Sequence, residues 1–107
     1  MDEIEELAEI FKALSDPTRL RLVKLLSKHP LQDCPNECNG QEFLCVNALA
    51  HRLGVTQSAV SQHLRILRQA RIVRGVRRGH FMHYSIDQDG LGQYKAKLLE
   101  VLGEDFG

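Results

Sequence analysis

Residues 49–73 read LAHRLGVTQSAVSQHLRILRQARIV, and this stretch decides the fold. Gly54 is a typical helix stop, and Thr56 is a typical N-cap for a helix that begins directly after it. Apolar residues then recur at the spacing of one helical face: Val60, Leu64 and Leu67. The pattern predicts a short helix over about residues 45–53, a tight turn, and a second helix over residues 57–70.

The residues after these two helices change from helical to partly alternating periodicity. β-branched and aromatic side chains fill two short runs, the first with Ile72, Val73 and Val76 and the second with Phe81, Met82, Tyr84 and Ile86. Between the runs lies Arg77-Arg78-Gly79-His80, where glycine allows the positive φ of a turn. The sequence therefore predicts a β-hairpin with a basic tip, and a helix-turn-helix followed by such a hairpin is a winged helix-turn-helix.

Three further helices are predicted around this motif. Residues 3–14 carry apolar side chains at helical spacing, and Asp16-Pro17 supplies an N-cap and a first-turn proline for a helix that runs to about Ser27. Residues 29–42 form a long loop, and Asp87 opens a last helix over residues 87–102. We expect a single domain, residues 1–107, of the mainly α (α+β) class with five helices and one β-hairpin wing.

The charge pattern points to a class of partner. From Phe43 to Ile86 the chain has seven arginines and no aspartate or glutamate, although the net charge of the whole protein is zero. The flanks are acidic, because residues 1–42 carry five Lys/Arg against nine Asp/Glu and residues 87–107 carry two against five. A basic segment between acidic flanks is typical of a surface for a polyanion, with nucleic acid the first candidate and a solvated basic face the alternative.

Several other classes of protein are disfavoured by the sequence. No apolar run approaches the ~20 residues that span a bilayer, and the acidic N-terminus is unlike a signal peptide, so we expect a cytoplasmic protein. An enzyme is not expected, because no Cys-x-x-Cys at a helix start, Gly-rich phosphate loop, catalytic triad or pair of carboxylates stands out.

The chemistry of DNA reading falls on the outer face of helix 57–70 and on the hairpin tip. Recognition helices present N-terminal residues to base edges, where glutamine pairs with adenine and arginine with guanine. Arginines at a wing tip suit phosphates or a narrow minor groove. His63 is either a phosphate contact or a half-buried packing residue. The candidate DNA-binding residues are Thr56, Gln57, Ser58, Ser61, Gln62, His63, Arg65, Arg77, Arg78 and His80.

Three stretches resemble the ArsR/SmtB family of metal-sensing repressors: LSDPTRLRLVKLL (14–26), residues 49–73 and RRGHFMHYSI (77–86). The similarity covers about residues 4–100, and SAVSQHLRIL is its most specific part. Arg71 departs from the family, which usually has glycine between the recognition helix and the first wing strand. The resemblance implies a homodimer in which helices 3–14 and 87–102, each with a wide apolar stripe, pair across a two-fold axis. Such a dimer would bind an inverted-repeat operator.

The three cysteines are candidates for the regulatory site. Cys34, Cys38 and Cys45 have the spacing C-x3-C-x6-C, and soft thiolates select thiophilic ions. Three sulfurs suit As(III) or Sb(III), and also Cd(II) or Pb(II). Arsenic sensors of the family carry a CVC-type motif where this chain has Cys45-Val46-Asn47, so only Cys45 is implied by the resemblance. We infer that Cys34 and Cys38 supply the other ligands from the loop.

Other roles for the cysteines stay open at this point. The family's last-helix zinc site uses Asp and His pairs, and residues 87–102 contain no histidine. A Cys3His zinc site with His29, a thiol redox or persulfide switch, a structural zinc that does not switch, and thiols without a special role are the alternatives. We expect a repressor that leaves its operator when ligand binding draws the loop onto Cys45 and tilts the helix over residues 45–53.

Overall fold

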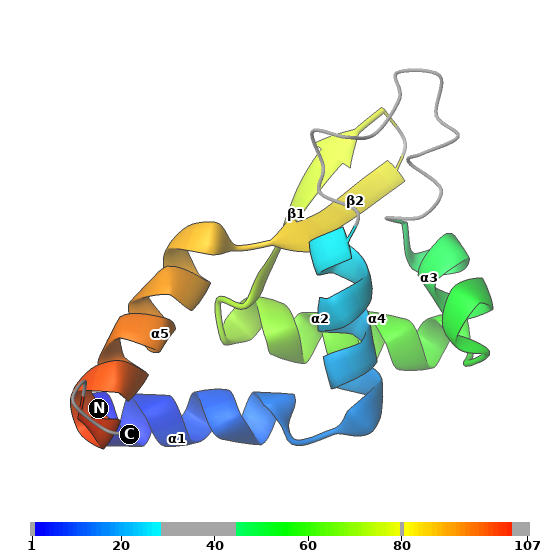
Figure 1. Cartoon of the computed structure of the whole chain (residues 1–107). Coiled ribbons are helices and arrows are strands. Elements are labelled where there is room, and N and C mark those ends of the chain that lie inside the picture. The colour runs from blue at the N-terminus through cyan, green and yellow to red at the C-terminus, as the bar shows by residue number, and fades with distance from the viewer. Residues whose placement is uncertain (1, 29–44, 80, 104–107) are drawn as a thin grey trace.

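The computed structural model describes residues 2–28, 45–79 and 81–103, and it has the expected winged helix-turn-helix fold (Figure 1). The elements in chain order are α1 (Glu3–Leu14), α2 (Pro17–Lys28), α3 (Val46–Leu53), α4 (Gln57–Gln69), β1 (Val73–Arg78), β2 (Phe81–Ile86) and α5 (Gln88–Leu102). The expected helix ends differ from these by at most one residue. Among the described residues no helix is long and apolar enough to cross a membrane.

The core lies where α2 packs on the inner face of α4. Five leucines from three helices are at most 1% exposed and form its centre: Leu22, Leu26, Leu49, Leu64 and Leu67. Burying a leucine side chain contributes about 1.5–3 kcal/mol relative to leaving it in water. Because α2 covers the inner face of α4, the opposite face of α4 stays in solvent.

Polar caps and one glycine fix the ends of the helices. Thr56 Oγ1 accepts a hydrogen bond from the Ala59 backbone N–H over 3.1 Å at the start of α4. Asp87 Oδ1 accepts one from the Gly90 N–H over 2.9 Å at the start of α5. Gly54 ends α3 with a φ of +67°, a left-handed conformation that glycine adopts without steric cost. The cap expected at Thr56 and the stop expected at Gly54 are confirmed, and Asp87, expected as the first residue of the last helix, is its N-cap.

The tip of the wing differs from the expectation. Arg77 and Arg78 belong to β1, where they pair with Met82 and Phe81, and not to the turn. The connection between the strands is therefore two residues long. Gly79 has a φ of +61°, which two-residue hairpin turns require. Charge and glycine in this run favour a turn in the sequence, whereas the pairing with β2 extends the strand through both arginines.

The turn between α4 and β1 contains Arg71, the residue that departs from the family. Arg71 has a φ of +61°, in the left-handed region that favours glycine, so this turn has the backbone geometry expected for the family's usual residue. α5 packs tightly on the turn, since a Cβ added to Gly90 would lie 2.1 Å from the Arg71 carbonyl oxygen. Tyr94 Oη also donates a hydrogen bond to the Ala70 carbonyl over 2.7 Å. These contacts join α5 to the C-terminal end of α4.

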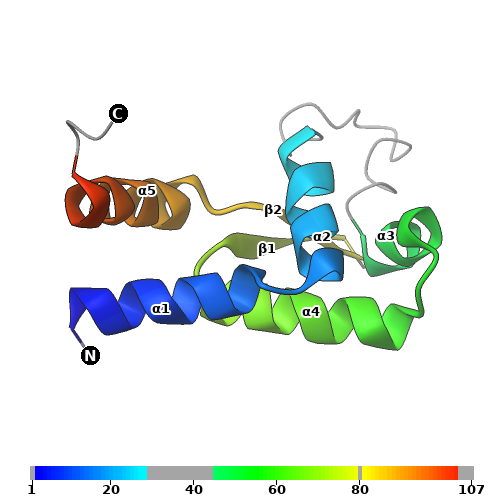
Figure 2. The same cartoon turned by 60° about the horizontal axis from the view of Figure 1, so that its bottom comes forward.

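α1 and α5 lie side by side at the end of the molecule away from α3 (Figures 1 and 2). Lys97 Nζ on α5 donates a hydrogen bond to Glu6 Oε1 on α1 over 2.5 Å. Both helices have the expected apolar stripes, and some residues of each stripe are buried in the core while others are exposed to solvent. Leu7, Ile10 and Ala13 of α1 and Tyr94 of α5 face the core.

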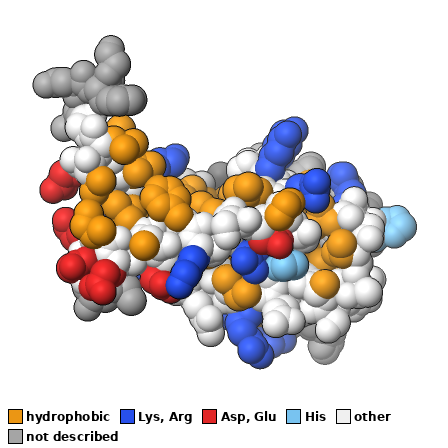
Figure 3. All heavy atoms as spheres, turned by 90° about the horizontal axis from the view of Figure 1, so that it is seen from below, with side chains coloured by type: hydrophobic (Ala, Val, Ile, Leu, Met, Phe, Trp, Pro, Cys, Tyr) orange, Lys and Arg blue, Asp and Glu red, His pale blue; other side chains and the backbone are white. Residues whose placement is uncertain are grey.

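Other apolar side chains of the two terminal helices are exposed. We call them the terminal patch, and they are 49–59% exposed: Ile4, Phe11, Leu99, Val101 and Leu102. Figure 3 shows hydrophobic side chains gathered at this end of the molecule, with acidic side chains beside them. The patch is left uncovered because the small core is already filled by the other faces of α1 and α5.

Candidate DNA-binding surface

The outer face of α4 carries the residues expected to read DNA. Val60, Leu64 and Leu67 point inward and are at most 1% exposed. Five other residues of α4 are polar and exposed: Gln57, Ser58, Ser61, Gln62 and Arg65. Their exposure agrees with the sequence expectation, because a period of 3.6 residues places them opposite the buried stripe. The first turn of α4 contains no acidic residue, so the partial positive charge of the helix N-terminus is available to a phosphate.

The first residue of α4 makes a contact that the sequence did not reveal. Gln57 Nε2 donates a hydrogen bond to Asn47 Oδ1 in α3 over 2.8 Å. In the sequence, Asn47 stands out only as the position of the second thiol in a CVC-type motif. Two polar residues ten positions apart in the chain give no pattern that sequence reasoning can detect. The contact fixes the direction of the Gln57 side chain relative to α3.

The side chain of His63 contacts two residues at the junction between α1 and α2, Asp16 and Arg19. It is half-buried, and its Nδ1 lies 3.3 Å from Arg19 Nη1 while its Nε2 lies 3.9 Å from Asp16 Oδ2. The Arg19 backbone N–H donates to Asp16 Oδ2 over 3.1 Å. This hydrogen bond, with the nearby charge of Arg19, holds the pKa of Asp16 below its usual value. Of the two readings left open for His63, these contacts favour the packing role.

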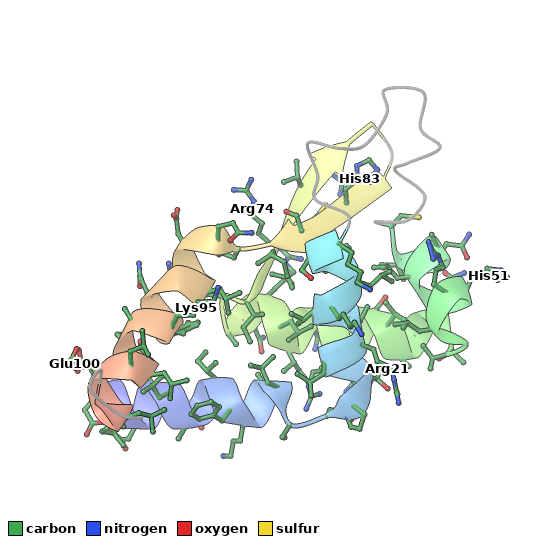
Figure 4. All side chains as sticks on the ribbon, in the orientation of Figure 1. Arg21, His51, Arg74, His83, Lys95 and Glu100 are labelled. Atoms are coloured by element: carbon green, nitrogen blue, oxygen red, sulfur yellow. The ribbon has the colours of Figure 1, made fainter. Side chains whose placement is uncertain are left out.

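The wing presents arginines along β1. Arg77 is exposed on the strand, and Arg78 follows it as the last residue of β1. His80 lies outside the described residues. Arg74, which the sequence analysis did not select, is exposed on the same strand and points away from the hairpin (Figure 4). The signal that could have included it is a third arginine in the same predicted hairpin as Arg77 and Arg78.

Comparison with known proteins decides the family. The profile described as bacterial regulatory protein, arsR family, matches residues 16–74, which is more than half of the chain. The chain belongs to the ArsR family. The match spans α2, the helix-turn-helix and the start of the wing, so it contains the five core leucines and the outer face of α4.

Three relatives are similar to this ArsR-family chain. The transcriptional repressor SmtB homologue of Synechocystis sp. is 40% identical over 86 residues, which are 80% of this chain and 55% of the relative. The cadmium resistance regulatory protein CadC homologue of Staphylococcus aureus is 30% identical over 86% of this chain and 66% of the relative. The arsenic resistance regulator ArsR1 of Pseudomonas putida is 34% identical over 72% and 51%. The chain thus spans about half the length of the first and last of these.

Solved structures of regulators share the fold over nearly the whole chain. An ArsR-like transcriptional regulator from Rhodococcus sp. RHA1 has a TM-score of 0.66 and 29% identity, and the match covers 95% of this chain and 83% of that one. NolR from Sinorhizobium fredii has a TM-score of 0.63 and 30% identity, with 94% and 88% covered. The relatives are transcriptional regulators, and the expectation that this ArsR-family protein is not an enzyme is confirmed.

Only one of the three expected metal ligands lies in the described part of this ArsR-family protein. Cys45 is half-buried and is the N-cap residue of α3. Cys34, Cys38 and the alternative ligand His29 lie outside the described residues. Within the described residues, no three side chains of ligand type come together as a metal site. The structure therefore leaves the predicted cysteine site as a prediction.

Proposed function

We propose that the protein is a transcriptional repressor that binds operator DNA with α4 in the major groove and the β1–β2 wing on the flanking backbone. The observation that carries this proposal is the polar, exposed outer face of α4 in an ArsR-family fold. Gln57, Gln62 and Arg65 have the donors and acceptors that suit adenine and guanine edges. Arg77 and Arg78 are placed on a strand that can follow the phosphate backbone, with Thr56, Ser58, Ser61 and His80 as flanking contacts.

The protein acts, in this proposal, as a homodimer through α1 and α5. The terminal patch brings five apolar side chains from two helices into solvent, and exposed apolar patches mark interaction surfaces. A two-fold axis through the patch would place the two α4 helices on one side of the dimer. Such an arrangement fits an inverted repeat whose half-sites lie about one DNA turn apart.

The inducer in this proposal is a thiophilic metal or metalloid held by Cys34, Cys38 and Cys45. As(III) or Sb(III) is favoured, followed by Cd(II), Pb(II) or Zn(II), and the cadmium and arsenic resistance regulators among the relatives support a metal ligand in general. The described donor fits this chemistry, because Cys45 supplies a soft sulfur that is half-buried at the start of α3. Soft ions prefer thiolate ligands.

The path from the cysteines to the DNA-reading helix is short. Cys45 is the N-cap of α3, and Asn47 in the first turn of α3 accepts the hydrogen bond from Gln57. A change in the position of α3 would therefore reach the first residue of α4. Weakening of operator binding by roughly 100-fold needs a coupling free energy of about 3 kcal/mol, within the usual range for allosteric proteins.

A release experiment tests both parts of the proposal. An operator is selected from a random duplex pool, and its release is measured with As(III), Sb(III), Cd(II), Pb(II), Zn(II), peroxide and polysulfide. Failure to select any duplex bound more tightly than random DNA would reject the DNA-binding proposal.

Three serine variants assign the sensor. Cys34→Ser, Cys38→Ser and Cys45→Ser should each keep operator binding and lose release by the metal or metalloid, because a hydroxyl replaces a thiolate poorly. A dithiol redox switch needs two cysteines, so one variant would still respond to peroxide or polysulfide. If all three variants release DNA as the parent does, the cysteines are not the sensor.

A further inference from the structure

The segment Asp16-Pro17-Thr18-Arg19 forms the corner between α1 and α2, and the proposed DNA contacts do not include it. Arg19 is half-buried there and makes two side-chain contacts. Its Nε donates a hydrogen bond to the Ala13 carbonyl near the end of α1 over 2.6 Å, and its Nη1 lies 3.3 Å from His63 Nδ1 on α4. One guanidinium therefore joins the end of α1 to the middle of the recognition helix.

The Arg19 contact determines how the His63 ring is used. A guanidinium has only donors, so His63 Nδ1 must accept the hydrogen bond, and the ring proton of the neutral imidazole is on Nε2. That Nε2 faces Asp16 Oδ2 at 3.9 Å. Both ring nitrogens are thus directed at the α1–α2 corner, which leaves neither directed at a phosphate.

The contact adds a constraint that the apolar core does not supply. Val60, Leu64 and Leu67 hold α4 against α2, but leucine and valine contacts are not directional. A planar guanidinium that bonds one carbonyl and one ring nitrogen tolerates little rotation or sliding of α4. The orientation of Gln57, Gln62 and Arg65 toward DNA depends on that rotation.

We propose that His63 is a positioning residue, and that its Arg19–His63 contact fixes the recognition helix relative to α1. α1 carries two residues of the terminal patch, Ile4 and Phe11. Through α1, the contact therefore sets the angle between the outer face of α4 and the proposed dimer interface. The inference rests on the proposed DNA-binding function and concerns which residue orients the helix.

Two substitutions at His63 separate positioning from a phosphate contact. Asparagine places a side-chain oxygen near the position of Nδ1, whereas glutamine places a side-chain NH2 near the position of Nε2. If His63 acts through Arg19, His63→Asn keeps operator affinity within about twofold of the parent, and His63→Gln loses about tenfold, or roughly 1.4 kcal/mol. In both variants the dependence of affinity on salt stays that of the parent, because no phosphate contact is lost.

A second pair of variants tests the partner of His63. Arg19→Gln should lower operator affinity at least as much as His63→Gln, because it also removes the hydrogen bond to the Ala13 carbonyl. The double variant should be little worse than Arg19→Gln alone, because both substitutions remove the Arg19–His63 contact. Arg21→Gln is the matched control: it removes the same charge from the same helix, and Arg21 points into solvent (Figure 4). Arg21→Gln should keep operator affinity close to that of the parent.

The opposite pattern overturns the inference. If Nε2 contacts a phosphate, His63→Gln would keep operator affinity and His63→Asn would lose it. The plot of log affinity against log salt concentration would also become less steep for His63→Asn, by the release of about one counterion. Additive losses for Arg19→Gln and His63→Gln also overturn it. Thermal melting of each variant identifies losses that come from unfolding, and equal destabilisation of His63→Asn and His63→Gln with equal loss of binding counts against the positioning role. A parent that binds no operator fails the proposed function instead.

Discussion

Asn47 Oδ1 of α3 accepts a hydrogen bond over 2.8 Å from Nε2 of Gln57, the first residue of the recognition helix. The bond occupies a donor of Gln57 and holds its side chain in one direction before DNA binds. It also connects the helix that begins after Cys45 with the helix that carries the proposed DNA-reading residues. Asn47, at the position where a second thiol of a CVC-type motif would stand, therefore has a structural use in this protein.

Replacing Asn47 tests this connection. Asn47→Ala should lower operator affinity by about 1 kcal/mol, because Gln57 then has to be ordered on binding. The measurement is the operator dissociation constant of Asn47→Ala alone and in a Gln57→Ala background. The Asn47 effect should disappear in that background. An Asn47 effect of the same size without Gln57 would show that Asn47 acts by another route.

The recognition helix and the wing should respond differently to alanine. Gln62→Ala or Arg65→Ala is expected to cost about 1–3 kcal/mol of specific binding and to relax sequence preference. Arg77→Ala should weaken binding to all sequences and reduce the salt slope by about one ion, because a phosphate contact carries no base information. Binding to the operator and to a scrambled duplex at several salt concentrations separates the two. Unchanged operator affinity in Arg65→Ala would place α4 outside the groove.

The helices and strands of this fold could be predicted because the capping residues and the apolar periodicity in the sequence indicate the same element boundaries. Gly54, Thr56 and the stripe from Val60 to Leu67 each specify the same turn and helix, and the structure has them there. The contacts of His63 and Gln57 could not be predicted, since they join residues 44 and ten positions apart through side chains that have no periodic signature. The wing tip was misplaced because strand pairing through Arg77 and Arg78 depends on the partner strand.

Two glycines of α5 should respond oppositely to alanine. A Cβ on Gly90 would lie 2.1 Å from the Arg71 carbonyl oxygen, so Gly90→Ala should lower the free energy of unfolding by about 1–3 kcal/mol. Gly92 has nothing within 4 Å of an added Cβ, so Gly92→Ala should raise stability by about 0.5–1 kcal/mol through helix propensity. Denaturant unfolding at equal protein concentration measures both. Equal effects would mean that α5 does not pack on the α4–β1 turn as described.

The ion pair between the terminal helices predicts part of the acid sensitivity. The hydrogen bond and charge of Lys97 hold the pKa of Glu6 below its ordinary 4.5, and Glu6 raises the pKa of Lys97 above 10.5. A lowered carboxyl pKa gives stability that is complete above the unfolded-state pKa and is lost as the pH falls through the folded-state pKa. For Lys97 the sign is reversed, so its contribution is lost as the pH rises through its folded-state pKa.

Removing the Glu6 carboxylate should therefore make the stability of the protein less dependent on pH at acid pH. Glu6→Gln should be less stable than the parent at neutral pH, and the two should converge as the pH falls below about 4.5. Thermal melting between neutral and acid pH measures this convergence. Glu9→Gln serves as the control, because Glu9 lies on the same helix and its contact with Lys12 is longer, at 3.5 Å, and exposed. A constant difference between Glu6→Gln and the parent at every pH would contradict the prediction.

The terminal patch should hold the dimer together. Leu99 is 53% exposed, so Leu99→Glu removes little from the core of one protomer but would bury a charge at the proposed interface, at a cost of several kcal/mol. The variant should sediment as a monomer at micromolar concentration and bind a full inverted repeat no better than a single half-site.

Gln93→Glu adds the same charge to an exposed, polar position of α5 and should remain dimeric. Leu99 is a cleaner probe than Leu98, which is half-buried, because a charge at Leu98 would also disturb the protomer. If Leu99→Glu stays dimeric and binds the inverted repeat like the parent, the two-fold contact lies elsewhere on the molecule.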